Sequence, residues 1–173
     1  MPSVERERYT LRAYGATDYD AVIAIFQSNT PQFFAPSEPD DFTRFLRAPD
    51  SELLVATSTA GTVVGFGAAY RRSDREGGLA WGMVHRTWHR HGVGRALLEA
   101  RIALLWAQSV TQIRVHTSQH SAGFFARCGF VTVAVEPDGF ALGIDQVTML
   151  LSRSTAGRSS TGAADPAANT GGC

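Results

Sequence analysis

Two glycines at the start of an apolar segment are the feature that most constrains how this chain can fold. They stand in the stretch HRHGVGRALL, residues 89–98, and the apolar pattern runs on to residue 108 with Arg95 and Glu99 on its polar side. That periodicity predicts a largely buried helix over 93–108. A helix N-terminus presents unpaired N–H groups and the positive end of the helix dipole, and glycine lets an anion approach the backbone closely. The pattern therefore favours a phosphate-binding helix start.

Three interpretations of this glycine pair compete. A dinucleotide-binding fingerprint requires a third glycine where this chain has Leu97, and its glycines directly follow a strand, whereas residues 85–91 intervene here. A Walker-type loop requires lysine, and all sixteen basic residues of this chain are arginine. The third interpretation is a helix start that binds nothing, and the glycine pair alone leaves it open.

The pattern of the other segments predicts a mixed sheet flanked by helices, an α+β arrangement within the broad α/β class. We expect the order β-α-α-β-β-β-α-β-α-β-β, with Thr17 or Asp18 as the N-cap of the first helix. The expected ranges are strand 8–14, helices 18–28 and 38–47, a hairpin of 52–59 and 62–72, strand 78–85, helix 93–108, strand 111–117, helix 119–128, and strands 130–136 and 145–152. We expect one domain over 1–152 and a disordered tail over 153–173, where the residues are small and polar.

Charge and cysteine content narrow the classes of partner and compartment. Sixteen basic residues balance sixteen acidic ones, which argues against nucleic acid or an anionic membrane as a partner. The N-terminus MPSVERERYT carries alternating charges rather than the pattern of a signal peptide. The two cysteines, Cys128 and Cys173, do not suggest a disulfide framework. We therefore expect a cytoplasmic protein.

Two motifs in order, VHRTWHRHGVGRALL and then SQHSAGFFARCGF, give a more specific indication. Together they resemble the Gcn5-related N-acetyltransferase (GNAT) superfamily, and the resemblance covers roughly residues 8–152. That family carries Arg/Gln-x-x-Gly-x-Gly/Ala at its central helix and Asn-x-x-Ala-x-x-x-Tyr-x-x-x-Gly-Phe further on. The resemblance implies acetyl-CoA as cosubstrate, with the loop His89–Ala96 around its pyrophosphate. The implied coenzyme-binding residues are Val84, His85, His89, Arg90, His91, Gly92, Val93, Gly94, Arg95, Ala96, Ser118 and Phe125.

The chain departs from the family pattern at several positions. His89 replaces the usual Arg or Gln, Arg86 replaces a proline, and Ser118 replaces an asparagine. Phe125 stands where the family commonly has the tyrosine that is assigned to protonate the leaving thiolate. Ionisable residues often found four or six positions before the strand-end valine are Ala80 and Gly78 here.

Because those positions are apolar, the base must come from elsewhere. His116 precedes Ser118 by two residues on a predicted strand, so both side chains should share a face, and His116 is the first candidate for the base. Glu76 could act through water, and the backbone near Val84 could stabilise the tetrahedral intermediate. The pairs His85/His89 and His116/His120 have metal-ligand spacing, but no cysteine or carboxylate joins them locally, so we predict no metal site.

The resemblance implies that the first two helices and the connection between the last two strands shape the acceptor pocket. We therefore expect Phe33, Phe34, Glu38 and Asp138 to contact the acceptor. The resulting prediction is direct transfer of an acetyl group to a primary amine of a small molecule or peptide, by a protein that could be a homodimer. The alternatives are a coenzyme A-binding regulatory module without catalysis and a metal-binding protein built on the histidines.

Overall fold

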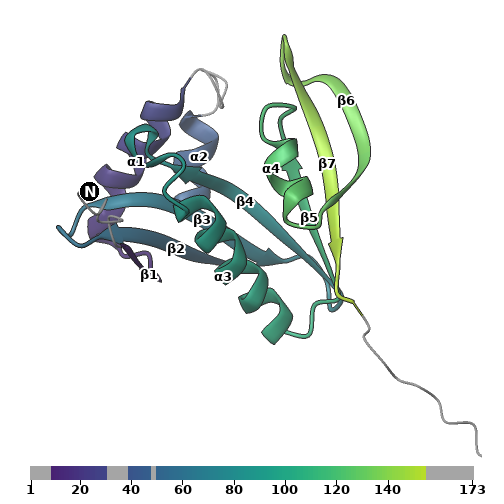
Figure 1. The fold of residues 1–173 in the computed structure, drawn as a ribbon, viewed down its shortest axis with the longest axis horizontal. Coiled ribbons are helices and arrows are strands. Elements are labelled where there is room, and N and C mark those ends of the chain that lie inside the picture. Colours follow the sequence, from purple (N-terminus) through teal and green to yellow (C-terminus); the bar gives the residue numbers. More distant parts are fainter. Residues whose placement is uncertain (1–8, 31–38, 48–49, 155–173) are drawn as a thin grey trace, which may run out of the picture.

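A seven-stranded mixed sheet organises the chain in the computed structural model, which describes residues 9–30, 39–47 and 50–154. The strand order is β1-β2-β3-β4-β5-β7-β6, and helices lie on both faces (Figure 1). The order of the main elements and the mixed α/β class are as predicted. The elements are β1 (Tyr9–Ala13), α1 (Tyr19–Asn29), α2 (Pro39–Leu46), β2 (Ser51–Ser58), β3 (Val63–Arg71), β4 (Glu76–Val84), α3 (Val93–Ala107), β5 (Gln112–Thr117), α4 (Ala122–Arg127), β6 (Val131–Ala141) and β7 (Ile144–Ser152), with short 3-10 turns at Ala16–Asp18 and Arg86–Trp88.

Two predicted boundaries are wrong. The fourth helix begins at Ala122 rather than 119. Strand β6 continues to Ala141, so the predicted connection from Glu136 to Phe140 is part of a strand. Its register against β7 shifts between Glu136 and Ala141, and it lies at the edge of the sheet. An edge strand tolerates proline and glycine, so these turn-like residues wrongly indicated a connection where the strand continues.

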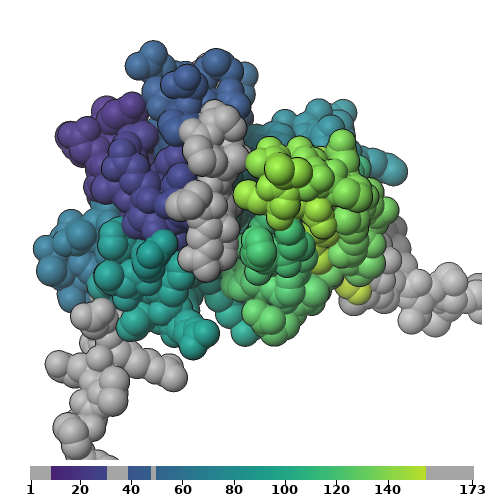
Figure 2. Space-filling model, turned by 90° about the horizontal axis from the view of Figure 1, so that it is seen from above, coloured from purple at the N-terminus to yellow at the C-terminus, as the bar shows by residue number. Residues whose placement is uncertain are grey.

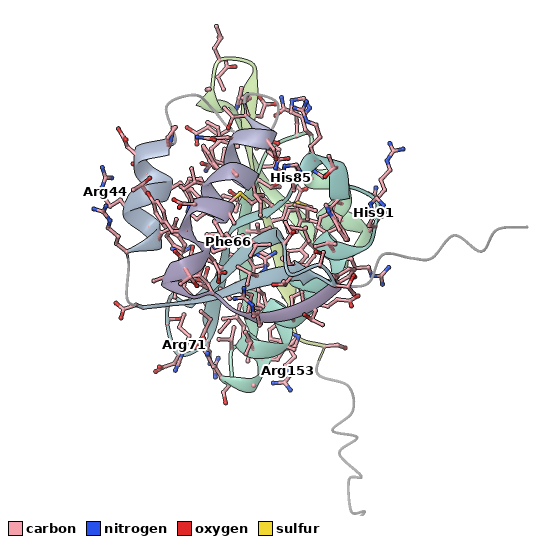
Figure 3. The ribbon with its side chains drawn as sticks, turned by 90° about the vertical axis from the view of Figure 1, so that its left-hand side faces the viewer. Arg44, Phe66, Arg71, His85, His91 and Arg153 are labelled. Atoms are coloured by element: carbon pink, nitrogen blue, oxygen red, sulfur yellow. The ribbon has the colours of Figure 1, made fainter. Side chains whose placement is uncertain are left out.

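The side chains of β3 point alternately to the two helical layers, one on each face of the sheet. Phe66 packs edge to face on Phe42 of α2, with ring centroids 5.7 Å apart. A Cβ on the preceding residue, Gly65, would fall 2.8 Å from a methyl group of Leu97 on α3. Successive strand side chains point to opposite faces, so α1 and α2 cover one face of the sheet and α3 covers the other. Figure 3 shows Phe66 in the interior, whereas Arg44 and Arg71 lie at the periphery.

A stripe of glycines lets α3 lie close to β3 and β4. Leu97, Arg101 and Leu105 recur every four residues on α3, and all three are buried. A side chain on Gly65 would collide with Leu97, one on Gly77 with Leu105, and one on Gly67 or Gly82 with Arg101. The helix is therefore held against the sheet by one row of side chains, whose middle member is an arginine.

The sheet opens between β4 and β5. These two parallel strands pair only from Glu76 to Leu79, opposite Gln112 to Val115. Beyond Leu79, a register shift interrupts the pairing of β3 with β4, and Trp81 adopts a positive φ of 51°. The strands then diverge (Figure 1), so that β5, β7, β6 and α4 form a second half of the molecule. Figure 2 shows this half, in green to yellow, opposite the purple and blue N-terminal half.

Asp18 is the N-cap residue of α1, one of the two residues predicted for this position, and it also connects the helix to β1. Its buried carboxylate makes no capping hydrogen bond to α1. Instead it accepts two hydrogen bonds from the Arg12 guanidinium, at 2.7 and 2.8 Å, and one from the Gly15 N–H at 2.8 Å. The hydrogen bonds from Arg12 lower the pKa of Asp18 below its ordinary value.

Candidate active site

A cavity of about 520 Å³ fills the opening between the two diverging strands. Its walls come from β4 after Leu79, the first turns of α3, the end of β5 and the helix α4. The volume is within the range typical of small-molecule sites. The divergence of β4 from β5 leaves residues 80–84 without a β5 partner, so this stretch of backbone can pair with an extended ligand.

The first turn of α3 opens onto this cavity. Gly92 is the N-cap residue with a φ of +84°, a left-handed conformation that favours glycine. The first helical hydrogen bond joins Ala96 N–H to Gly92 O at 3.0 Å, which leaves the N–H groups of Val93, Gly94 and Arg95 without a helical acceptor.

Gly94 is not required by its protein neighbours. A Cβ there would lie 3.6 Å from Val84 Cγ2 and 3.9 Å from Phe124, both ordinary contacts, and its φ is not positive. The missing side chain instead leaves the helix N-terminus accessible from the cavity, which Gly94 lines. This is the arrangement that an anion requires.

Positive charge surrounds the same end of the cavity. Arg90 and Arg95 precede or begin α3, and Arg127 approaches from α4. Arg95 and Glu99, which were predicted to lie on the polar side of the helix, form an exposed ion pair at 2.8 Å. Among the described residues that line the cavity, none is an aspartate or a glutamate. The described wall therefore favours an anionic ligand.

The predicted coenzyme-binding residues divide into two groups. Eight of them line the cavity: Val84, His89, Arg90, Gly92, Gly94, Arg95, Ser118 and Phe125. The other four, His85, His91, Val93 and Ala96, do not. Val93 is fully buried against Leu97 and Val64, whereas His85 is half-buried and His91 is exposed; both histidines are labelled in Figure 3.

Two side chains hold the end of strand β4. The carbonyl oxygen of Val84 accepts a hydrogen bond from Asn29 Nδ2 at 2.9 Å, and His89 Nε2 lies 2.9 Å from the same oxygen. Asn29 is buried at the end of α1 and lines the cavity. Asn29 could not be predicted from the sequence, because a single polar residue at a helix end carries no pattern that indicates its partner.

His116 lines the cavity from β5. Its Nδ1 lies 3.0 Å from Oγ1 of the buried Thr148 on β7. Partial burial lowers the pKa of His116 below its ordinary value, and the charges of Arg114 and Arg72 lower it further. The imidazole is therefore neutral at neutral pH and can accept a proton.

Glu76, the second candidate base, does not line the cavity. Its carboxylate accepts a hydrogen bond from Arg114 Nε at 2.6 Å and lies 3.5 Å from Arg72. The hydrogen bond from Arg114 lowers the pKa of Glu76, which makes this carboxylate a weaker base.

Gly78, the second position at which the family often has an ionisable residue, is covered by the ring of Tyr70. A Cβ added to Gly78 would be 2.6 Å from the Tyr70 hydroxyl oxygen.

The predicted acceptor residues are only partly visible. Phe33, Phe34 and Glu38 lie outside the described residues. Asp138 has a φ of 55° and supports the β6–β7 hairpin, where its N–H donates to Asp145 Oδ1 at 3.0 Å. The cavity wall on this side includes Trp81, Met83, Phe140 and Ile144 instead.

Neither a metal cluster nor a membrane-spanning helix is found within the described ranges. No three His, Cys, Asp or Glu side chains come together there in a geometry for a metal ion. The longest helix in this part of the chain, α3, has 15 residues, and no helix there is long and apolar enough to cross a bilayer.

Fold and cavity together define a mixed α/β protein with a cavity suited to an anionic ligand, and comparison with known proteins gives its family. The acetyltransferase (GNAT) domain family matches residues 18–153. The chain therefore belongs to the GNAT acetyltransferase family, and the predictions of the family and of an N-acetyltransferase enzyme are confirmed. Among curated proteins, none matches the sequence.

Solved structures share this fold over nearly their whole length. The ribosomal-protein-S18-alanine N-acetyltransferase from Escherichia coli is 21% identical, with a TM-score of 0.73, and the match covers 88% of this chain and 98% of that one. Ard1 from Thermoplasma volcanium is 25% identical, with a TM-score of 0.69 and coverage of 83% and 97%. A GNAT family acetyltransferase from Elizabethkingia anophelis with acetyl-CoA bound is 15% identical, with a TM-score of 0.66 and coverage of 84% and 98%. The acetyl-CoA bound in this last structure, and the coenzyme A bound in that of an aminoglycoside 6'-N-acetyltransferase, agree with the predicted cosubstrate.

Proposed function

We propose that this chain transfers an acetyl group from acetyl-CoA directly to a primary amine of a small molecule or peptide. The observation that carries the proposal is one continuous cavity that joins the open N-terminus of α3, at Gly92 and Gly94, to the imidazole of His116. One end suits a phosphate and the other offers a neutral base, which are the two requirements of acetyl transfer from a coenzyme A thioester.

In this proposal, the coenzyme lies along the unpaired edge of β4. Its pyrophosphate binds the first turn of α3, where Arg90, Arg95 and Arg127 supply positive charge. Its extended arm pairs with the backbone of residues 80–84, which β5 leaves free. Asn29 and His89 fix the end of this edge by holding the Val84 carbonyl.

The chemistry follows from this placement. The amine nitrogen attacks the thioester carbon, the C–N bond forms, and the C–S bond breaks to release coenzyme A. His116 Nε2 accepts the proton that the amine loses, while Thr148 holds the other ring nitrogen. Backbone N–H groups of the interrupted β4 edge stabilise the oxyanion. Phe125 lines the cavity but has no proton to give, so the thiolate is protonated by water or by the proton from the amine.

A second candidate is a coenzyme A-binding regulatory module without catalysis. Two observations favour it: Phe125 stands at the position of the family's tyrosine, and none of the described cavity residues is a carboxylate. Both candidates require the coenzyme, and they differ only in turnover.

Two measurements separate these functions. Titration calorimetry with coenzyme A and acetyl-CoA should give saturable binding, and failure of both ligands to bind would remove both candidates. A panel of amines, including small polyamines, amino acids and N-terminal peptides, should then release free thiol from acetyl-CoA for at least one class. Tight binding with no turnover across the panel favours the regulatory module. A homodimer and a cytoplasmic location are further proposals that rest on the sequence alone.

A further inference from the structure

Arg101 is a buried cation on the described wall of the cavity that has no acidic partner. It lies in the middle of α3 and is only 3% exposed. None of the ion pairs among the described residues includes it. Its Nε donates to Leu97 O at 3.0 Å, and its Nη1 donates to Ala68 O at 3.3 Å and Ala80 O at 3.5 Å. These acceptors are neutral carbonyls, so its charge is not balanced within the described structure.

The third nitrogen of the guanidinium, Nη2, takes part in none of these hydrogen bonds. Two glycines make room for the group: a Cβ on Gly67 would fall 2.7 Å from Arg101 Cζ, and one on Gly82 would fall 2.9 Å from Nη2. Gly82 and Arg101 both line the cavity. The free N–H bonds of Nη2 thus lie at the cavity edge of strand β4.

Burial of this charge indicates a ligand that carries the opposite charge. Burial lowers the pKa of Arg101 to about 10, so the group stays protonated at neutral pH. A buried charge without a counter-ion costs several kcal/mol, and an anion that binds beside it recovers part of that cost. No carboxylate lies among the described residues of the cavity wall, so an anionic ligand that enters the cavity can supply the opposite charge.

The position of Arg101 shows which part of the ligand it meets. It lies eight residues beyond Val93, so it is roughly 12 Å along α3 from the phosphate-binding turn. Its contacts are with Ala80 and Gly82, at the interrupted part of β4. If the coenzyme lies as proposed above, this is its thioester end rather than its phosphate end.

The candidate base, His116, lies on the face of the sheet opposite α3. Ile113 and Val115 of β5 pack in the same cluster as Leu98 and Leu105 of α3, so their side chains point to the α3 face. His116 alternates with Val115 and therefore points away from α3. The amine must reach the thioester from the His116 side, which leaves the α3 side for the acyl group.

We propose that Arg101 binds a carboxylate at the far end of the acyl group, so that the site takes coenzyme A thioesters of short dicarboxylic acids, such as malonyl- or succinyl-CoA, in preference to uncharged acyl donors. This rests on the proposed function and deepens it by naming the class of donor. In the reaction, the amine nitrogen forms a bond to the thioester carbon, the C–S bond breaks, and His116 takes the proton that the nitrogen loses. Coenzyme A leaves as the thiolate and becomes the thiol by taking a proton from water or the proton that His116 holds, and the distal carboxylate stays ionised in the amide product.

The test compares donors of similar length in binding, because the acceptor need not be known. Titration calorimetry of the full chain with succinyl-CoA and butyryl-CoA should show at least tenfold tighter binding of succinyl-CoA. In Arg101→Met, an unbranched apolar side chain replaces the cation between the two glycines, and the preference should disappear. Arg101→Lys keeps the positive charge, so this variant should retain part of the preference for succinyl-CoA over butyryl-CoA. Arg95→Met is the matched control: it removes an arginine from the phosphate end and should weaken both donors equally.

Other results of these measurements would contradict either the donor preference or the proposed function. Equal or tighter binding of butyryl-CoA to the wild-type chain would overturn the proposal while leaving the proposed function intact, and this measurement needs no variant to fold. If Arg101→Met keeps its melting temperature and still binds succinyl-CoA at least tenfold more tightly than butyryl-CoA, the guanidinium does not bind the distal carboxylate and the proposal is overturned. If coenzyme A itself fails to bind, the proposed function fails and the donor preference fails with it.

Discussion

His116 Nδ1 and Thr148 Oγ1 are 3.0 Å apart, across the pairing of β5 with β7. Thr148 is buried, so this contact fixes the imidazole ring while its other nitrogen remains available on the cavity side. A donor–acceptor contact at one ring nitrogen decides which tautomer the ring adopts. If Nδ1–H donates to the threonine hydroxyl, Nε2 carries the lone pair that a general base requires.

Replacing His116 tests this role directly. His116→Ala should lower kcat by about 10²–10⁴-fold, the usual contribution of a general base, while the affinity for coenzyme A stays the same. Steady-state kinetics and calorimetry on the same preparation check both values. His120→Ala is the matched control, because His120 also lines the cavity but is not proposed as the base. A full rate in His116→Ala would show that the amine loses its proton elsewhere.

The acid limb of the pH profile depends on the charges near His116. Burial is the largest cause of its lowered pKa, followed by Arg114 and Arg72. A base is active when deprotonated, so kcat/KM should be flat at neutral pH and fall as the pH drops below that lowered pKa. Arg114→Gln removes a positive charge and frees the negative charge of Glu76, and both changes raise the pKa of His116. The acid limb should therefore move to higher pH, whereas Arg71→Gln, in an exposed pair with Asp74, should leave it in place.

Gly94 allows a paired test of the phosphate site. Gly94→Ala should keep the fold, since its Cβ would meet Val84 Cγ2 at an ordinary 3.6 Å, but it should weaken coenzyme A binding, because the methyl group narrows the approach to the N-terminus of α3. Gly94→Asp adds a negative charge where the pyrophosphate is proposed to bind and should abolish detectable binding. Calorimetry with coenzyme A, together with a thermal melt of each variant, measures both effects. A folded Gly94→Asp variant with normal affinity would remove the phosphate from the α3 N-terminus.

Much of the fold could be predicted from local pattern, and the glycine pair is the clearest example. Gly92 and the apolar residues after it place the start of α3 within a residue of the prediction, because the capping conformation and the helical period are both local properties. The opening between β4 and β5 could not be predicted in this way. The local sequence of each strand predicts only an ordinary strand. The cavity arises because the pairing of the two strands ends at Leu79 and Val115.

Arg101 was not predicted as a site residue, although its position in the sequence indicates that it is buried. It recurs with Leu97 and Leu105 at four-residue spacing, on the face that the apolar pattern predicts to be buried. A charged residue in such a row requires a partner, and the four glycines of β3 and β4 that face α3 supply the space but not a charge. Asn29 carried no such signal, because its role depends on Val84, which is distant in the sequence.

The contact between Arg12 and Asp18 should contribute to stability. Asp18→Asn weakens two ionic hydrogen bonds, so the free energy of unfolding at neutral pH should fall by roughly 1–3 kcal/mol. The pKa of Asp18 is lowered in the folded state, so its contribution is present above the unfolded value of about 3.9 and is lost as the pH falls through the folded value. Urea titrations should show the two proteins converging in acid. Asp41→Asn, in an exposed pair with Arg44, should change stability little at any pH.

Phe125 offers a test of how the thiolate leaves. The ring packs edge to face against Phe124 and Phe130, with centroids 5.2 and 5.4 Å away, and it lines the cavity. Phe125→Tyr adds a hydroxyl that could protonate the leaving sulfur, so kcat should rise while the affinity for acetyl-CoA stays nearly constant. Because a thiol has a pKa of roughly 8.5, the gain should shrink as the pH approaches that value.

The neighbouring ring provides the control for this substitution. Phe124→Tyr adds the same hydroxyl to another residue of the cavity wall, and it should not raise kcat if the position of the proton donor matters. A pH series of kcat for the wild-type chain and the two variants measures the effect. If Phe125→Tyr gives no gain at any pH, protonation of the sulfur does not limit the rate or the ring does not reach it. If both variants gain equally, added polarity in the cavity is responsible, because a proton donor acts only from the position that faces the sulfur.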